Sequence, residues 1–212
     1  MKINVLALDG VFDTGLAAVL DAFAIANELA AMSGLESPRF DVTVTGMRRR
    51  SRSAQGLGVP AAAAERKKTP DWVVVPAIGC NMPAPLAHAL TRADVRDALA
   101  MLRAWAGNGT SMAAACVGTF VLAEAGLLEG EEATTTWWLA PMFRQRYPEV
   151  KLDESRMVVR SDTVVTAGAA LSPIDMALSL IRQASPELAG GSRSAWWSTR
   201  VRRNRPMRSP TI

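Results

Sequence analysis

The residues whose types and order best suit a reactive site lie between Thr110 and Gly126. Small residues come first, followed by Cys116, a small-residue turn and an amphipathic segment that ends at a glycine. This order is typical of a nucleophile elbow, in which a tight turn from a strand into a helix projects one reactive side chain. At the amino end of a helix, free N–H groups and the macrodipole favour a thiolate. The residues alone leave a second interpretation open, in which Cys116 is a small buried hydrophobic residue.

Two backbone amides and a second thiol are candidates to complete this site. Val117 follows the cysteine directly and Gly79 follows another apolar run, so we expect both amides to face a developing oxyanion. Cys80 follows the same run and would resolve an oxidised Cys116 if their Cα atoms lay within about 7 Å of each other. Two unconnected thiols are the simpler alternative.

The aromatic residues and the single histidine carry weaker signals. Trp137 and Trp138 are typical of either a pocket wall or the core, and we expect one of each. His88 is expected to be an exposed helix residue rather than a catalytic base. One histidine and two cysteines are too few for a zinc site, and Gly56 and Gly58 lack the third glycine of a dinucleotide fingerprint. We therefore expect no metal and no cofactor.

The elements that must position Cys116 alternate along the chain. A mostly parallel sheet with helices on both faces follows from this βαβ order. Ligands of such folds bind beyond the carboxyl ends of the strands, so residues after different strands should gather at one edge. We predict segment 61–64 as a loop or short helix. We predict strands at 3–8, 39–45, 72–78, 111–115, 157–160 and 164–167, and helices at 16–32, 91–106, 117–125, 138–147 and 172–184.

The charge of the chain is concentrated at its carboxyl end. The formal net charge is +4, but residues 193–212 hold six arginines and no acid. The rest of the chain has 18 basic residues against 20 acidic ones, which argues against a broad nucleic-acid-binding face. We predict one domain over residues 1–189 and a basic, extended or disordered tail over 190–212. A basic arm that binds nucleic acid or a partner is the alternative for the tail.

Composition also bounds the cellular setting. Apolar runs broken by Gly, Asp or Pro predict no transmembrane helix, and the short apolar run at the amino terminus predicts a first strand rather than a signal peptide. Two cysteines form no disulfide framework, so a reducing cytoplasm is expected.

The stretch Ala114-Ala-Cys-Val-Gly-Thr-Phe-Val-Leu-Ala-Glu-Ala-Gly-Leu-Leu-Glu-Gly130, followed by Ala133-Thr-Thr-Thr-Trp137, resembles the ThiJ/PfpI superfamily. This superfamily has the class I glutamine amidotransferase-like fold, and the chain is most similar to the branch that forms the N-terminal domain of AraC-type transcriptional regulators. The resemblance extends to Asp9–Asp13, to Val73–Pro76 and to the segment from Gly168 through the last helix. It implies a flavodoxin-like three-layer α/β sandwich, a strained elbow cysteine, a pocket at the carboxyl edge and a homodimer.

The resemblance also implies an acid and a base near the thiol. The acid comes from the first helix region, where Asp13 and Asp21 are the candidates; alternatively, Asp13 caps that helix and Asp21 is solvated. The base is missing, because Thr136 stands where the family pattern has histidine. A hydrolytic thiol needs an oriented base, so a Cys-His protease or a glutamine amidotransferase is disfavoured.

Three functions remain after this step. The first is a sensor domain, of or related to an AraC-type regulator, that binds a polar metabolite or amine beside Cys116. Its DNA contacts would be made by a separate helix-turn-helix domain for which this chain has no pattern. The second is a cysteine-dependent hydrolase or hydratase with Asp13 or Asp21 as the acid–base group. The third is a redox or scaffolding role. The expected pocket residues are Gly79, Cys80, Val117, Thr136 and Trp137.

Overall fold

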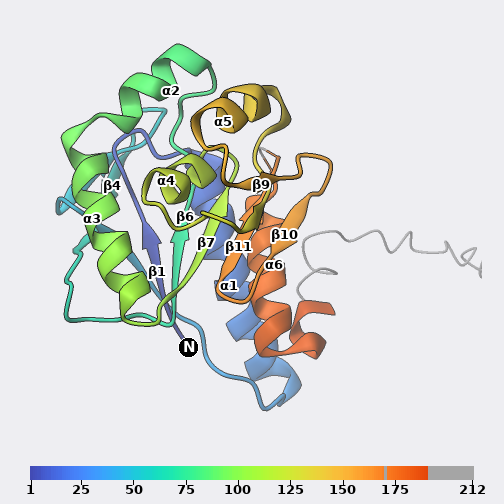
Figure 1. The fold of residues 1–212 in the computed structure, drawn as a ribbon. Coiled ribbons are helices and arrows are strands. Elements are labelled where there is room, and N and C mark those ends of the chain that lie inside the picture. Colours follow the sequence, from blue (N-terminus) through green and yellow to red (C-terminus); the bar gives the residue numbers. More distant parts are fainter. Residues whose placement is uncertain (170, 191–212) are drawn as a thin grey trace, which may run out of the picture.

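A mixed seven-stranded sheet forms the centre of the molecule (Figure 1). The computed structural model describes residues 1–169 and 171–190. Only the β10–β11 pair is antiparallel among the pairs of this sheet, so the expected mostly parallel α/β architecture is confirmed. The strands follow the order β10 (Val158–Arg160), β11 (Val164–Ala167), β7 (Ser111–Ala115), β6 (Trp72–Val75), β1 (Lys2–Leu6), β2 (Asp41–Gly46) and β5 (Ala62–Ala63).

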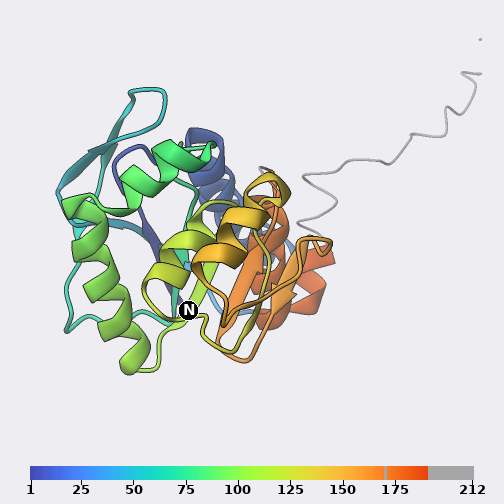
Figure 2. The same ribbon diagram turned by 45° about the horizontal axis from the view of Figure 1, so that its top comes forward.

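Helices cover both faces of this sheet and make the predicted three layers (Figures 1 and 2). One face packs on α1 (Asp13–Ser33) and α6 (Pro173–Ala184), and its core includes Val5, Phe23 and Met176. The core of the other face includes Leu6, Leu102 and Phe120. The helices on that second face are α2 (Pro83–Leu90), α3 (Ala93–Gly107), α4 (Gly118–Glu124) and α5 (Ala140–Arg146), with the 3-10 turn η1 (Trp137–Leu139).

Helix α1 is long and apolar, although its sequence pattern predicted no segment long enough to span a membrane. By length and composition alone it could cross a membrane, a test that core helices of soluble proteins also pass. In the structure its buried side, including Val19, Phe23 and Ala26, packs into the same core as α6. Gly34 ends the helix with a left-handed backbone, as helix C-termini commonly do.

The register of the central strands brings the predicted site segments to one edge. Val75 pairs with Ala114, and the Cys116 amide continues the ladder by donating to the Ala167 carbonyl at 2.7 Å. The Phe12 amide likewise donates to Ala77 at 2.7 Å. The turns after β1, β6, β7 and β11 therefore meet at the carboxyl edge, as predicted.

Short strands were the elements that sequence patterns missed. Segment 61–64, predicted as a loop or short helix, contains β5, whose Ala62 pairs with Thr45 of β2. Alanine favours helices, so this pairing is a tertiary effect that overrides local preference. The other short strands are β3 (Arg50–Arg52), which pairs with β4 (Gly58–Pro60), and β8 (Glu132–Ala133), which pairs with β9 (Lys151–Leu152).

The carboxyl end of the domain is packed as far as the structure describes it. Leu188 and Ala189 are buried in the same core as α1 and α6. Except for Gly190, the predicted basic tail lies outside the described residues.

Candidate functional site

Cys116 occupies the turn between β7 and α4 in a strained backbone conformation. Its φ is 55°, and it is the only non-glycine residue with positive φ among residues 1–169 and 171–190. Such a conformation costs about 1–3 kcal/mol and persists only where its surroundings hold it. The Cys116 carbonyl accepts hydrogen bonds from the Thr119 amide at 3.2 Å and the Thr135 hydroxyl at 2.9 Å. The predicted elbow is therefore present.

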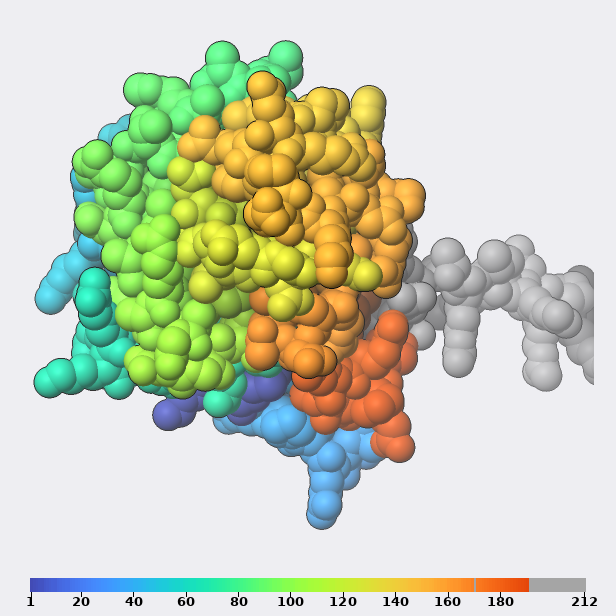
Figure 3. Space-filling view, in the orientation of Figure 1, coloured from blue at the N-terminus to red at the C-terminus, as the bar shows by residue number. Residues whose placement is uncertain are grey.

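The glycine after the turn is required by close packing. A β-carbon on Gly118 would lie 2.3 Å from the carbonyl oxygen of Val75 and 2.9 Å from that of Pro76. Helix α4 thus begins directly against the end of β6, and no larger residue fits without moving backbone. In the space-filling view, the segment that carries η1 and α5 lies beside α4 at this end of the molecule (Figure 3).

Three consecutive buried threonines line the back of the elbow, and they differ in their partners. The Thr134 hydroxyl donates to the Arg156 carbonyl at 2.9 Å, and the Thr135 hydroxyl donates to Cys116. The Thr136 hydroxyl lies beside the Cys116 sulfur and has no partner of normal hydrogen-bond geometry among the described residues. Thr136 is therefore the member of the trio whose hydroxyl faces the Cys116 sulfur instead of a backbone carbonyl.

Burial controls the protonation of the Cys116 thiol. The side chain is only 4 % exposed, and burial raises its pKa above the ordinary value. The Val117 amide and the Thr136 hydroxyl act in the opposite direction but do not reverse the shift. Burial therefore opposes the thiolate that the helix-terminal position favours.

The two candidate acids serve other parts of the fold. The Asp13 carboxylate accepts a hydrogen bond from the Gln55 amide at 3.0 Å, and its hydrogen bonds with Ser53 and Gln55 hold its pKa below the usual value. Its Oδ1 atom is buried without a partner in the described part of the chain. Asp21 is exposed on α1. Neither carboxylate is among the groups that shift the pKa of Cys116.

Gly79 and Cys80 lie on the loop after β6 and have their own contacts. The Gly79 amide already donates to the Gly10 carbonyl at 2.5 Å, so it is not free to bind an oxyanion. Cys80 is a partly buried free thiol, and it is among the groups that raise the pKa of the Arg92 guanidinium. Arg92 in turn pairs with the buried Asp94 at 2.7 Å. The resolving role of Cys80 remains a hypothesis.

The two tryptophans differ in burial. Trp138 packs against the core and its ring N–H donates to the Asn81 carbonyl at 2.9 Å. Trp137 is 69 % exposed, and its ring stands edge-on to Trp138 with centroids 5.7 Å apart. His88 is exposed on α2. Trp137 is therefore available at the surface next to Thr136, while its role in a pocket stays a prediction.

Some residues that build the elbow were not identified from the sequence. Thr119 donates its hydroxyl to the Thr134 carbonyl at 3.1 Å, and a β-carbon on Gly168 would lie 2.8 Å from the Thr134 hydroxyl oxygen. The position of Gly168 directly after a predicted strand was the one available signal. Within residues 1–169 and 171–190, no cluster of three or more His, Cys, Asp or Glu side chains is arranged to hold a metal ion.

The fold and site together define a class of domain, an α/β sandwich with a strained cysteine at the turn after β7. The DJ-1/PfpI family model matches residues 1–183, and the chain belongs to this family. The expected ThiJ/PfpI resemblance is thus confirmed.

Curated relatives are transcriptional regulators. The HTH-type transcriptional regulator GbdR of Pseudomonas aeruginosa is 27 % identical over 203 residues, covering 95 % of this chain and 52 % of that protein. The HTH-type transcriptional regulator CdhR of the same species is 37 % identical over 83 residues, covering 39 % of this chain and 24 % of that protein. This chain thus spans about half the length of GbdR, and the match to CdhR covers a shorter part.

Solved structures share the fold. An AraC family transcriptional regulator from Pseudomonas putida superposes with a TM-score of 0.76 at 18 % identity, covering 92 % of this chain and 98 % of that one. Drosophila melanogaster DJ-1beta superposes with a TM-score of 0.70 at 17 % identity, covering 92 % and 96 %. The same architecture therefore occurs in regulator domains and in DJ-1 proteins.

Proposed function

We propose that this domain senses a small molecule beside Cys116 as part of an AraC-type transcriptional regulator. The observation that carries the proposal is a thiol that is only 4 % exposed and has a raised pKa, beside the buried hydroxyl of Thr136. A protonated thiol is a poor nucleophile, so ligand binding is favoured over catalysis at this site. The regulator names of the curated relatives support the same function.

The chemistry of the elbow favours a small polar ligand. The Val117 amide and the Thr136 hydroxyl are donors that would bind a carbonyl or carboxylate oxygen. The exposed ring of Trp137 would bind an alkylammonium group by a cation–π contact. A polar metabolite or an amine therefore fits the proposal. The regulator would act in the cytoplasm as a homodimer and contact DNA through a separate helix-turn-helix domain.

A thermal-shift screen with amines, amino acids and small carboxylates tests this proposal. A ligand that binds only the folded state raises the melting temperature. We expect the rise to be lost in Cys116→Ala and Thr136→Val and kept in Cys80→Ser, the matched thiol control. A compound that stabilises all four proteins equally would place the ligand elsewhere and contradict the proposal.

The strained backbone of Cys116 favours a second candidate, a cysteine-dependent hydrolase or hydratase. Alkylation by iodoacetamide across pH separates the two functions in a Cys80→Ser background. For the sensor we expect the apparent pKa of Cys116 to lie above that of a free cysteine thiol, and to rise further in Thr136→Val because the hydroxyl lowers the pKa. A value well below that, with turnover of a screened compound that Cys116→Ser abolishes, would establish the enzyme instead.

A further inference from the structure

The segment that returns from the outer strand β2 to β6 contains no helix. The chain passes from β2 to β6 through the β3–β4 hairpin, β5 and a loop, without a helix. Strands of a parallel sheet are normally covered on both faces and are apolar throughout. Here β1 and β2 alternate instead, with Asn4, Thr43 and Thr45 on the side away from the buried Ile3 and Val5. The alternation therefore indicates that one side of β1 and β2 faces a polar space.

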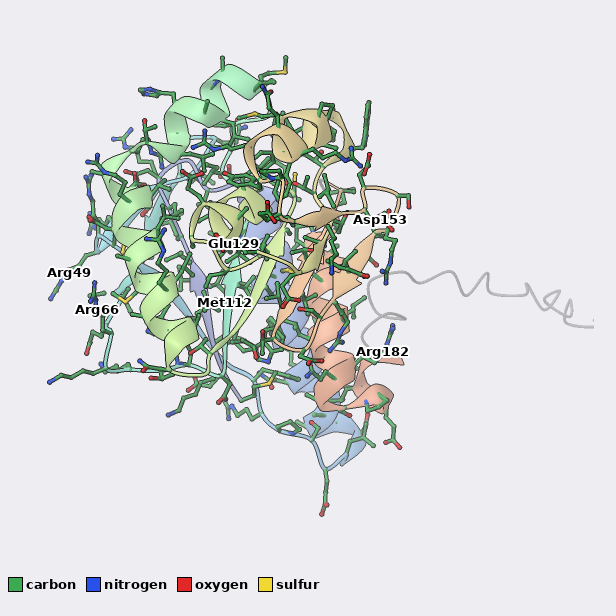
Figure 4. All side chains as sticks on the ribbon, in the orientation of Figure 1. Arg49, Arg66, Met112, Glu129, Asp153 and Arg182 are labelled. Atoms are coloured by element: carbon green, nitrogen blue, oxygen red, sulfur yellow. The ribbon has the colours of Figure 1, made fainter. Side chains whose placement is uncertain are left out.

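This space is a groove of about 690 Å³ between the two strands and segment 62–70. Its volume lies within the range of small-molecule sites, about 300–1,000 Å³. Segment 62–70 is attached to α3, because the Trp105 ring N–H of that helix donates to the Glu65 carbonyl at 3.2 Å. Figure 4 shows Arg66, which is not among the lining residues, at the outer rim of the molecule. We call this space the β1–β2 groove.

The wall of the β1–β2 groove holds a buried polar atom without a partner. Thr45 is 4 % exposed, and its hydroxyl oxygen accepts and donates no hydrogen bond among the described residues. Most buried hydroxyls in proteins are hydrogen-bonded, so this hydroxyl has donor and acceptor capacity that the described fold leaves unused. The Asn4 carboxamide, also on this wall, makes no hydrogen bond to a described residue either. Both groups suit a ligand that carries hydroxyl groups.

The rim of the groove concentrates one kind of charge. The whole chain has four lysines, and Lys2, Lys67 and Lys68 all line this groove. Lys68 pairs with Glu65 at 2.8 Å, whereas Lys2 and Lys67 make no ion pair with a described residue. Asp41 is the remaining acid of the lining. The unpaired charges of the groove therefore sum to one positive charge.

We propose that the β1–β2 groove binds a small phosphorylated metabolite that also carries hydroxyl groups. Lysine binds phosphate as a compact point charge, and three of the four lysines of the chain line the groove. The Lys2 and Lys67 ammonium groups would hold the phosphate, and Thr45 and Asn4 would bind the hydroxyls. This site is separate from Cys116 and does not depend on the function proposed there.

Titration calorimetry of the full chain with glycerol 3-phosphate tests the proposal, with inorganic phosphate and glycerol as partial probes. We expect glycerol 3-phosphate to bind, inorganic phosphate to bind more weakly and glycerol not to bind. Lys67→Ala should weaken binding about tenfold through the lost charged hydrogen bond. Lys151→Ala, which removes the one lysine outside the groove, is the matched control and should leave binding unchanged, as should Cys116→Ala.

Thr45→Val separates ligand contact from folding. Its melting temperature should equal or exceed that of the wild type, because the lost hydroxyl had no partner, while its affinity for glycerol 3-phosphate should fall about tenfold. Amide chemical shifts should move at residues 2–4, 41–45 and 62–70. No binding, binding that Lys67→Ala and Lys151→Ala weaken equally, or shifts confined to other segments would overturn the proposal.

Discussion

The Cys116 elbow and the β1–β2 groove satisfy their polar groups in opposite ways. At the elbow, the Cys116 carbonyl and the hydroxyls of Thr119, Thr134 and Thr135 are all hydrogen-bonded within the fold. In the groove, the Thr45 hydroxyl and two lysine ammonium groups have no partner in the described chain. The fold itself supplies partners to these groups of the elbow, whereas it supplies none to the named groups of the groove. The comparison teaches that the strained turn of this fold and its unpaired polar wall lie in different places.

Adding one carbon atom at the elbow is expected to have the largest effect. In Gly118→Ala the new β-carbon would lie 2.3 Å from the Val75 carbonyl oxygen, so backbone must move. We expect the free energy of unfolding, measured with urea, to fall by about 3 kcal/mol or more.

Gly107→Ala is the matched control, because a β-carbon at this end of α3 meets no atom within 4 Å. Alanine favours a helix more than glycine does, so we expect an unchanged or slightly higher stability, by about 1 kcal/mol at most. Equal losses in both variants would mean that the elbow is no more tightly packed than an ordinary helix end.

Removing a buried threonine hydroxyl should have the next largest effect, and it should differ between the elbow and the groove. In Thr135→Val the Cys116 carbonyl loses a donor, and we expect a loss of about 1–2 kcal/mol in the free energy of unfolding. In Thr45→Val no hydrogen bond is lost, and we expect stability within about 0.5 kcal/mol of the wild type or above it. Urea unfolding of both variants measures the contrast, and a larger loss for Thr45→Val would reverse it.

The smallest effect is expected from alkaline pH, and it belongs to the elbow. Burial raises the pKa of Cys116 in the folded state, whereas the unfolded thiol ionises near pH ~8.5. Above that pH the unfolded chain has lost the proton that the folded chain still holds. The stabilising contribution is therefore complete below about pH 8.5 and is lost as the pH rises through the folded pKa.

Cys116→Ala should lose less stability than the wild type as the pH rises above about 8.5. Tyr147 has a pKa that burial also raises, so it contributes the same loss to both proteins. The difference between the two proteins, measured by urea unfolding at each pH, is therefore the diagnostic quantity. Identical slopes in the two proteins would contradict a buried Cys116 with a raised pKa.

The central strands and the elbow could be predicted because their signals are local. Continuous apolar runs mark β6 and β7, and a cysteine between small residues and a helix marks the turn. The protonation of Cys116 could not be predicted, because the sequence shows its helix-terminal position but not its burial. The groove was missed for a related reason. Lys2, Thr45 and Lys67 each look like ordinary strand-end or loop residues until the sheet brings them together.

The hydroxyl hydrogen bonds of Thr119, Thr134 and Thr135 have a consequence for ligand binding at the elbow. They join the end of β7, the start of α4 and the approach to β10 through one short segment that ends at Thr136. A segment fixed at so many points has little conformational freedom left to lose. The elbow is therefore preorganised, and a molecule that binds there would meet side chains already ordered, so that little of its binding free energy is consumed by entropy loss in the protein.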